Sequence, residues 1–163
     1  MKKEYEFSSE RLFFRTIKES DSKQISVWRS DDRIIRFFKN PTSVSEIEQI
    51  NWYNNSYLND YSRYDFIVFY DDNPVGFVSL TDIHNDTAEV GYAIGEVSFQ
   101  KKKLSKEMIE AICSFGSKEF NISRFAAIVH RNNIASIKAA SSAGFSIEGE
   151  EGDFIVLNRL DVN

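Results

Sequence analysis

The sequence predicts an α/β (α+β) fold: a mixed, mostly antiparallel central sheet of about six to seven strands with helices on both faces. Three β-rich runs follow one another over residues 65–95, with turn residues between them. A strand, a long amphipathic helix, a strand and a short helix then alternate over residues 88–145. Hydrophobic residues make up 42% of the chain and charged residues 28%, as in an ordinary soluble protein. We expect one domain over residues 1–163, a length that can bury an adequate core.

The first third of the chain predicts one strand and two helices. Residues 12–17 are β-rich, and Ser20 or Asp21 can cap the helix that follows them. Ser43 and Glu46 stand three residues apart and fit a capping box. Apolar residues recur behind this pair at helical spacing, so a second helix is expected there.

The middle of the chain changes to the two-residue period of a sheet. Residues 65–70, 75–83 and 87–95 are rich in β-branched and aromatic side chains. Residues 71–74 and 84–86 separate these runs and contain the Asp, Asn and Pro typical of turns. Consecutive runs joined by short turns predict an antiparallel meander.

The last third alternates helix and strand. Apolar residues at spacings of four, four and three predict a helix across roughly 102–119. Residues 124–130 are expected to form a strand, and a helix near 133–143 should end at Gly144. The sheet is completed by two further β-rich runs, 145–147 and 153–157.

Charge, cysteine content and hydropathy argue against several function classes. The net charge is −5 and the pI near 5.1, whereas nucleic-acid binding leaves a basic footprint. The single cysteine, Cys113, excludes an internal disulfide; it falls on an apolar helical stripe and is expected in the core. No metal site is expected, because the two histidines lie far apart without a third ligand. No apolar run approaches the ~20 residues that cross a bilayer, and the N-terminus lacks a signal-peptide pattern. A cytoplasmic protein without a membrane partner is expected.

Residues 88–145 contain the candidate cofactor site. A strand leads to a helix N-terminus through a turn, and the first N–H groups of a helix lack partners, which suits a phosphate-bearing cofactor. Such turns normally contain glycines, but lysines and a serine stand here instead. The lysines at 101–103 either make charge-assisted contacts to phosphate or form a solvated helix entry.

The order and spacing of these segments resemble the Gcn5-related N-acetyltransferases, especially the branch that includes ribosomal-protein alanine and amino-sugar acetyltransferases. The resemblance spans nearly the whole chain, and it is carried by residues 9–12, 28–31, 51–53, 78–83, 88–92 and 133–145. It implies transfer of an acetyl group from acetyl-CoA to a small-molecule or peptide amine, without a metal. A homodimer is the further partner state considered.

The resemblance also implies how the cofactor is held. The strand over 89–95 is expected to splay from its neighbour and hydrogen-bond the pantetheine arm, and the next turn to wrap the pyrophosphate with the pattern Gln/Arg-x-x-Gly-x-Gly/Ala. Gln100 matches the first position, whereas Lys103 and Ser105 replace the glycines. If these positions are left-handed, each side chain costs ~1–2 kcal/mol. The cofactor residues implied in this way are Tyr92, Ala93, Ile94, Gln100, Lys101, Lys102, Lys103, Leu104, Ser105 and Asn133.

Glu89 and Ser136 are the candidate catalytic residues. The Glu89 carboxylate is expected to relay a proton from an ammonium acceptor; the other interpretation is a salt bridge or a solvent-facing strand residue. Asn133 and Ser136 share a helix face that the resemblance places near the thioester, although Asn133 can also be only a helix cap. Many relatives have a tyrosine four residues after Ser136 that acts as the acid for the leaving thiolate, where this chain has Ala140. Ser136, a water or the stability of the thiolate must then replace that acid.

Trp28, Arg29, Trp52 and Tyr53 are the candidate acceptor-binding residues, from the two N-terminal helices that cover the acceptor side in this family. Their aromatic rings can stack on an acceptor, and Arg29 can contact a phosphate through two hydrogen bonds. An amino-sugar nucleotide is therefore the first expected acceptor and a protein N-terminus the second. Both tryptophans can equally be core anchors. The alternative function is a non-catalytic binding module of the same fold whose cofactor loop has decayed.

Overall fold

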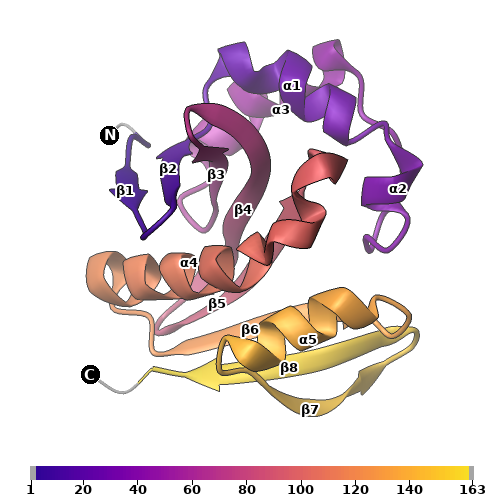
Figure 1. Cartoon of the computed structure of the whole chain (residues 1–163). Helices are drawn as coiled ribbons and strands as arrows, with labels where there is room; N and C mark the ends of the chain where they lie inside the picture. Colours follow the sequence, from indigo (N-terminus) through magenta and orange to yellow (C-terminus); the bar gives the residue numbers. More distant parts are fainter. Residues whose placement is uncertain (1–2, 162–163) are drawn as a thin grey trace.

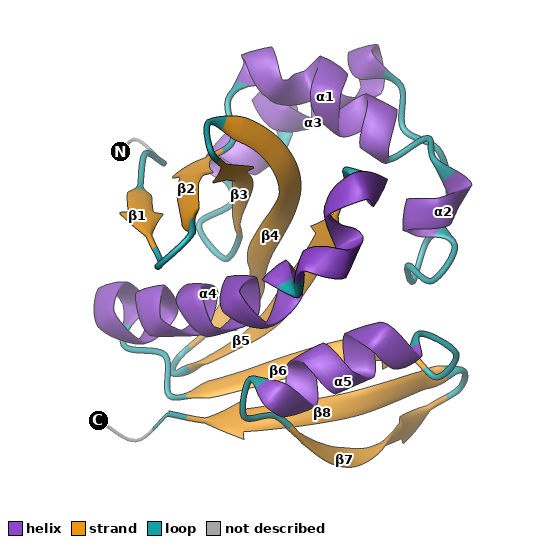
Figure 2. Ribbon diagram, viewed as in Figure 1, coloured by secondary structure: helices purple, strands orange, loops and turns teal. Residues whose placement is uncertain are grey.

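The computed structural model describes residues 3–161, apart from the side chain of Lys101. Its central sheet has the strand order β1-β2-β3-β4-β5-β6-β8-β7 (Figure 1). Helices cover both faces of the sheet (Figure 2), which confirms the predicted fold class. The strands are β1 (Glu6–Ser8), β2 (Leu12–Thr16), β3 (Tyr64–Tyr70), β4 (Asn73–His84), β5 (Thr87–Ile94), β6 (Arg124–His130), β7 (Ser146–Glu151) and β8 (Phe154–Leu160). The helices are α1 (Ser22–Trp28), α2 (Asp32–Ile35), α3 (Glu46–Asn55), α4 (Leu104–Phe120) and α5 (Ile134–Ser142), with 3-10 helices η1 (Glu19–Asp21), η2 (Tyr57–Asn59) and η3 (Val97–Lys102).

The described sheet has eight strands, so the expectation of six to seven was too low. The additional strand is β1, which has only three residues and pairs antiparallel with β2. A run of three is too short to display the two-residue period. Its central ring, Phe7, stacks on Phe14 and on Phe115 of α4, at 4.5 Å between centroids in each case. Packing across elements therefore holds this strand in place.

The antiparallel pairs β3–β4 and β4–β5 form the predicted meander. The turn before β4 contains Asp71 and Asp72 at φ 47° and 65°, and the next turn contains Asn85 at φ 56°. Asp and Asn tolerate this left-handed conformation better than most residues do. The turn residues of the sequence thus fit the tight connections of the meander.

Among the described strands, β5 and β6 form the one parallel pair, and this pair opens into a wedge. Their pairing covers three residues on each strand and ends at Glu89 and Ala126. β5 continues to Ile94 and β6 to His130, and Figure 1 shows the two strands diverging. Beyond Glu89, the edge of β5 that faces β6 has no partner strand among residues 3–161.

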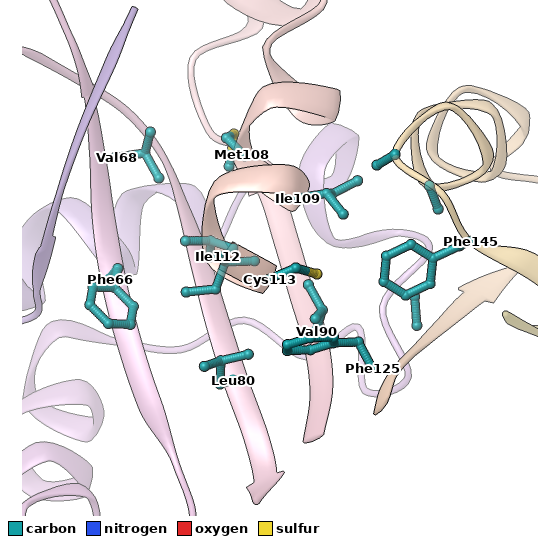
Figure 3. Close-up of a cluster of buried hydrophobic side chains, with 14 of the residues drawn as sticks. Phe66, Val68, Leu80, Val90, Met108, Ile109, Ile112, Cys113, Phe125 and Phe145 are labelled. Carbon is teal, nitrogen blue, oxygen red and sulfur yellow. The ribbon is translucent and has the colours of Figure 1, made fainter. Parts of the chain in front are cut away.

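A first hydrophobic core lies between α4, α5 and one face of the sheet. The predicted helix over 102–119 is confirmed as α4; Leu104, Met108 and Ile112 of its apolar stripe are buried, and Phe115 is partly buried (Figure 3). The helix predicted near 133–143 is confirmed as α5, and Gly144 behind it has φ +93°, the conformation expected of a C-terminal glycine. Cys113 lies in this core, as expected, and burial raises its pKa to about 12.

A second hydrophobic core lies on the opposite face, under α1, α2 and α3. The capping box predicted at Ser43 and Glu46 is wrong, because Ser45 and Glu48 exchange the two capping hydrogen bonds at 3.1 and 3.2 Å. Both pairs have the same spacing, so the sequence does not distinguish them. The Val44 carbonyl accepts a hydrogen bond from the Ser26 hydroxyl of α1 (2.7 Å), which keeps residue 44 outside the helix. None of the helices in residues 3–161 has the length and apolar character needed to span a bilayer.

Candidate active site

A cleft of about 700 Å³ lies at the wedge between β5 and β6. The central strands and the start of α5 form one wall, and residues from α1, α3 and the 37–40 segment form the other. Such a volume is within the range of small-molecule sites in proteins. The sheet therefore positions side chains from both splayed strands around one space.

Glu89 lies on β5, where pairing with β6 stops, and its carboxylate lines the cleft. Both of its oxygens accept hydrogen bonds from Lys39 Nζ, at 2.7 and 3.0 Å. The salt bridge considered from the sequence is thus present, but its partner comes from a loop 50 residues away rather than from a neighbouring strand. Lys39 is half exposed, and the pair faces the cleft.

The 37–40 segment contacts both splayed strands. Lys39 reaches Glu89 on β5, and the Phe37 ring lies 5.2 Å from the ring of His130 on β6. Sequence analysis missed this segment because it has neither a period nor a motif. The one signal that the sequence offers is a pair of phenylalanines between the basic residues Arg36 and Lys39.

Tyr92 and Ser136 form a hydrogen-bonded pair across the wedge. Ser136 Oγ donates to the Tyr92 hydroxyl at 2.7 Å, and this hydroxyl donates to the Ser136 carbonyl at 3.1 Å. Burial raises the pKa of Tyr92, while the hydrogen bond from Ser136 acts in the opposite direction, so the phenol stays protonated at neutral pH. The Asn133 side chain caps α5 by accepting from the Ser136 N–H at 3.2 Å. Ala140, where many relatives have a tyrosine, is fully buried in the first core.

The four predicted acceptor residues are divided between the cleft and the core. Arg29 and Trp52 line the cleft. Trp28 is only 1% exposed, and its Nε1 donates to the Glu96 carboxylate at 3.0 Å, so its side chain has no surface to offer a ligand. Tyr53 stacks on Tyr57 with a centroid distance of 5.6 Å and packs against the second core outside the cleft lining.

The lysine-rich turn forms the 3-10 helix η3 and enters α4 through Lys103, which has φ 56° and ψ 36°. The other described non-glycine residues with positive φ are all Asp or Asn. Position 103 thus has the backbone conformation that glycine favours, whereas Ser105 lies within the first turn of α4. Gln100 and Lys103 are exposed, and Lys102 Nζ lies 5.7 Å from the ring centroids of both Tyr70 and Phe99.

The first N–H groups of α4 have no side-chain cap. The side chain of Lys103, the N-cap residue, makes no capping hydrogen bond, and Glu107 of the first turn binds residues outside α4. Its carboxylate accepts from the Ser9 hydroxyl and from the backbone and side chain of Arg11, the latter two at 2.8 and 2.7 Å. Leu104 is buried in the first core, as is Ile94, and Ala93 packs against the second core. The side chain of Lys101 lies outside the described residues.

The described residues contain no group of three His, Cys, Asp or Glu side chains placed to hold a metal ion. Charged groups of the cleft that the sequence did not single out include Lys39, Arg63 and Asp65. Arg63 and Asp65 form a two-point ion pair with distances of 2.7 and 3.0 Å, and the Arg63 guanidinium lies 4.9 Å from the ring of Trp52.

The chain was compared with known proteins. It is 27% identical over 154 residues to an uncharacterized protein of Methanocaldococcus jannaschii, a match that covers 89% of this chain but only 30% of that protein. It is 27% identical over 153 residues to the uncharacterized N-acetyltransferase p20 of Bacillus licheniformis, covering 90% of this chain and 85% of p20. Its fold is similar to that of a spermidine N-acetyltransferase from Vibrio cholerae in complex with CoA and spermine. That likeness has a TM-score of 0.84 at 21% identity and covers 93% of this chain and 96% of that one.

Residues 11–146 also match the family model of the acetyltransferase (GNAT) domain. The matched region includes every residue that lines the cleft, together with the wedge and the turn before α4. The family match and the splayed parallel pair therefore lead to the same conclusion. The chain belongs to the GNAT acetyltransferase family.

Proposed function

We propose that this protein is an acetyl-CoA-dependent N-acetyltransferase that transfers the acetyl group directly to a primary amine. The observation that carries this proposal is the wedge. The edge of β5 beyond Glu89 has unpaired backbone groups, and the cleft lies beside it. An unpaired strand edge offers hydrogen bonds to an extended ligand in the way that a neighbouring strand would.

The residues present fit the donor in three places. The backbone of Tyr92, Ala93 and Ile94 would hold the pantetheine arm, and the first N–H groups of α4, including those of Leu104 and Ser105, would hold the pyrophosphate. Gln100, Lys101 and Lys103 would add contacts around it, and Asn133 would lie nearer the thioester. The contacts of Lys102 with Tyr70 and Phe99 leave it a smaller part than the sequence suggested. Acetyl-CoA, when bound, supplies the acetyl group as a thioester.

Glu89 would act as the base. An amine attacks only in its neutral form, and a carboxylate at the mouth of the wedge can accept the proton of the ammonium, directly or through water. Lys39 holds both oxygens of Glu89 and so fixes where this carboxylate lies. Lys39 is therefore a positioning residue in the proposal.

The Ser136–Tyr92 pair would hold the proton that the departing thiolate needs. Both hydroxyl groups lie in residues that line the cleft, whereas Ala140 is buried and carries no acid. The phenol of Tyr92 thus comes from a strand instead of from the helix that supplies the tyrosine in many relatives. Cys113 is buried in the core, which favours direct transfer over a cysteine-bound intermediate.

For the acceptor, an amino-sugar nucleotide is proposed first and a protein N-terminus second. Trp52 offers a ring for stacking, and Arg29 offers a guanidinium for a phosphate or carboxylate.

The test combines calorimetry of acetyl-CoA with a screen of primary amines, following the release of free CoA thiol. We expect micromolar binding of acetyl-CoA and thiol release with at least one amine. The buried Cys113 should add no background to a thiol reagent while the protein stays folded. No binding at millimolar acetyl-CoA would contradict the proposal and favour the non-catalytic module, whose support is the lysine at the left-handed position 103.

A further inference from the structure

The acceptor side of the cleft contains a positive charge that the protein does not neutralise. Arg29 follows α1 and lines the cleft. Its Nε is buried without a hydrogen-bond partner, and no hydrogen bond or ion pair to its guanidinium is found among residues 3–161. The contact that it does make is with the ring of Phe38, at 5.3 Å from the centroid. Arg29 is only partly buried, but a cation that loses part of its hydration without gaining a partner costs free energy, so this arrangement suits a ligand better than it suits stability.

The other cations of the cleft are already paired. Arg63 forms its two-point ion pair with Asp65, and Lys39 forms its own with Glu89. Asp65 acts on Arg29 through its charge, but among residues 3–161 no hydrogen bond or ion pair joins the two side chains. Among the described residues, Arg29 and Arg63 thus share one nearby carboxylate, and Arg29 is the arginine of the cleft that makes no direct ion pair with it.

The electrostatic setting agrees with this geometry. Burial is the main cause that lowers the pKa of Arg29, the positive charge of Arg63 lowers it further, and Asp65 opposes both. The guanidinium remains charged at neutral pH because an arginine begins far above that range. An incoming anion would replace lost hydration and meet a partly desolvated site, where charge-assisted hydrogen bonds are strong.

The same cleft holds negative charge at another place. Glu89 is near the wedge, and the exposed Glu48 and Asp82 also contribute to the lining. The sheet register separates the two regions, since Asp65 pairs with Ser79 on β4 and Glu89 lies beyond β4 on β5. Two strand spacings amount to on the order of 10 Å. Asp65, whose charge acts on Arg29, and the Glu89 carboxylate thus mark two parts of the cleft that lie about the length of a small metabolite or a tripeptide apart.

We propose that Arg29 binds an anionic group of the acceptor, a carboxylate or a phosphate, while the amine of the same acceptor lies at Glu89. The part concerning the amine rests on the proposed acetyl transfer, whereas the anion site does not. The enzyme would then prefer amines that carry a negative group over neutral amines and over polyamines. The Vibrio cholerae enzyme of similar fold, in complex with spermine, holds an acceptor of the opposite charge.

The first experiment needs no activity. Binding of inorganic pyrophosphate is measured with CoA saturating the pyrophosphate site proposed at α4, and it is followed by intrinsic fluorescence, because Trp52 lines the cleft while Trp28 is buried. Wild type should bind pyrophosphate saturably, and Arg29→Met should bind it on the order of 10- to 100-fold more weakly, as expected for loss of charge-assisted hydrogen bonds. Arg33→Met is the matched control, since Arg33 is exposed, pairs with Asp31 and does not line the cleft. It should bind as wild type does.

The stability of the ligand-free variants gives a second readout. Arg29→Met should melt no lower than wild type, because it removes an unpaired charge and keeps the packing of the stem. Arg29→Lys should keep the charge but bind pyrophosphate more weakly, since it loses the planar fork. An Arg29→Met chain that melts lower or fails to fold would show that the guanidinium serves the fold, and would overturn the proposal.

The third experiment compares matched acceptors by thiol release with acetyl-CoA. Trialanine is paired with trialanine amide, and glucosamine 6-phosphate with glucosamine; spermidine represents the polyamines. The KM of at least one anionic acceptor should be on the order of 10- to 100-fold below that of its neutral partner, and Arg29→Met should abolish this gap. The pair that shows the gap identifies carboxylate or phosphate as the preferred anion.

The outcomes separate the two proposals. Acetylation of neutral amines or spermidine as efficiently as anionic ones would overturn the anion site and leave the transferase intact. The anion site would also be overturned if the KM difference between anionic and neutral acceptors persisted in Arg29→Met. The same holds if pyrophosphate does not bind, or if Arg29→Met binds it as tightly as wild type does. If no amine is acetylated but pyrophosphate binding depends on Arg29, the proposed function fails and the anion site stands.

Discussion

At the scale of single residues, the site is defined by how each polar side chain is satisfied. Glu89 has both carboxylate oxygens on Lys39, and Ser136 shares its hydroxyl with Tyr92. Arg29 has no such partner among residues 3–161. Two polar groups of the cleft are therefore held in fixed positions, and one is left available to a ligand.

Replacing Glu89 by Gln should lower kcat by about 10²-fold at neutral pH, because general bases typically contribute 10²- to 10⁴-fold. The loss should shrink as the pH rises, since a growing share of the acceptor amine is then neutral without help. The measurement is the pH profile of thiol release at saturating acetyl-CoA. Glu150→Gln, an exposed change on β7 outside the cleft, is the control. An equal rate for Glu89→Gln and wild type at every pH would remove Glu89 from the mechanism.

Replacing Tyr92 by Phe should lower kcat by roughly 10-fold and leave the KM for acetyl-CoA within about 3-fold, because the ring keeps its packing and only the hydroxyl is lost. The unfolding free energy should fall by about 1–2 kcal/mol, because the hydroxyl group makes two hydrogen bonds and each usually contributes about 1 kcal/mol. Steady-state kinetics and denaturant unfolding measure these effects. Tyr53→Phe, which lies outside the cleft, should leave kcat unchanged. A Tyr92→Phe enzyme with the wild-type kcat would show that this hydroxyl group supplies no proton.

At the scale of elements, the junction between η3 and α4 departs most from the family pattern. Lys103 adopts the left-handed conformation, and Ser105 lies within the first turn of α4. The two positions where the family pattern has glycine therefore differ physically. At position 103 a glycine would ease the left-handed backbone angle, whereas at position 105 it would leave more space beside the first N–H groups of α4.

Lys103→Gly and Ser105→Gly should change stability in opposite directions. The first relieves a left-handed side chain and should stabilise the fold by about 1 kcal/mol. The second places glycine inside a helix and should destabilise it by roughly 0.5–1 kcal/mol. Urea unfolding of both variants measures the difference, and each serves as the control for the other. Lys103→Gly should also bind acetyl-CoA more tightly in calorimetry; weaker binding would mean that the lysine contributes its own contact.

At the scale of the whole molecule, hydrogen bonds join the connection between β1 and β2 to the N-terminal end of α4. Ser9 and Arg11 donate to the Glu107 carboxylate, and Arg11 also donates to the Lys102 carbonyl at 3.2 Å. Burial disfavours the charged form of Glu107, but these hydrogen bonds outweigh it and lower its pKa below 4.5. Hydrogen bonds from Ser62 likewise lower the pKa of Asp60.

Stability should therefore fall as the medium becomes acidic. The unfolded chain takes up protons on these carboxyls near pH 4–4.5, before the folded chain does, so the stabilisation is complete above this range and is lost below it. Glu107→Gln should lower the free energy of unfolding by about 1 kcal/mol at pH 7, a modest value because the site is partly exposed. The free energy of unfolding of this variant should also fall less steeply as the pH is lowered. Urea unfolding between pH 3 and 7 tests this, with Glu110→Gln on the exposed face of α4 as control. If the free energy of unfolding depended on pH equally in Glu107→Gln and in wild type, this prediction would be contradicted.

The sequence by itself determined the fold class and the order of the longer elements, but neither β1 nor the short helix α2. The meander, α4 and α5 follow from periods and turn residues that act between neighbours a few positions apart. The same local patterns placed Glu89 on the strand that opens the wedge, and Asn133 and Ser136 at the start of α5.

Only the tertiary structure decided the contacts between these elements. Lys39 meets Glu89 across 50 residues and Ser136 meets Tyr92 across 44, while Trp28 is buried and Arg29 is left without a partner. No period in the sequence encodes such pairs, because they depend on how the 37–40 segment and α5 dock against two strands that separate. Local patterns fix which face a side chain occupies, but the packing of distant segments decides what that side chain meets.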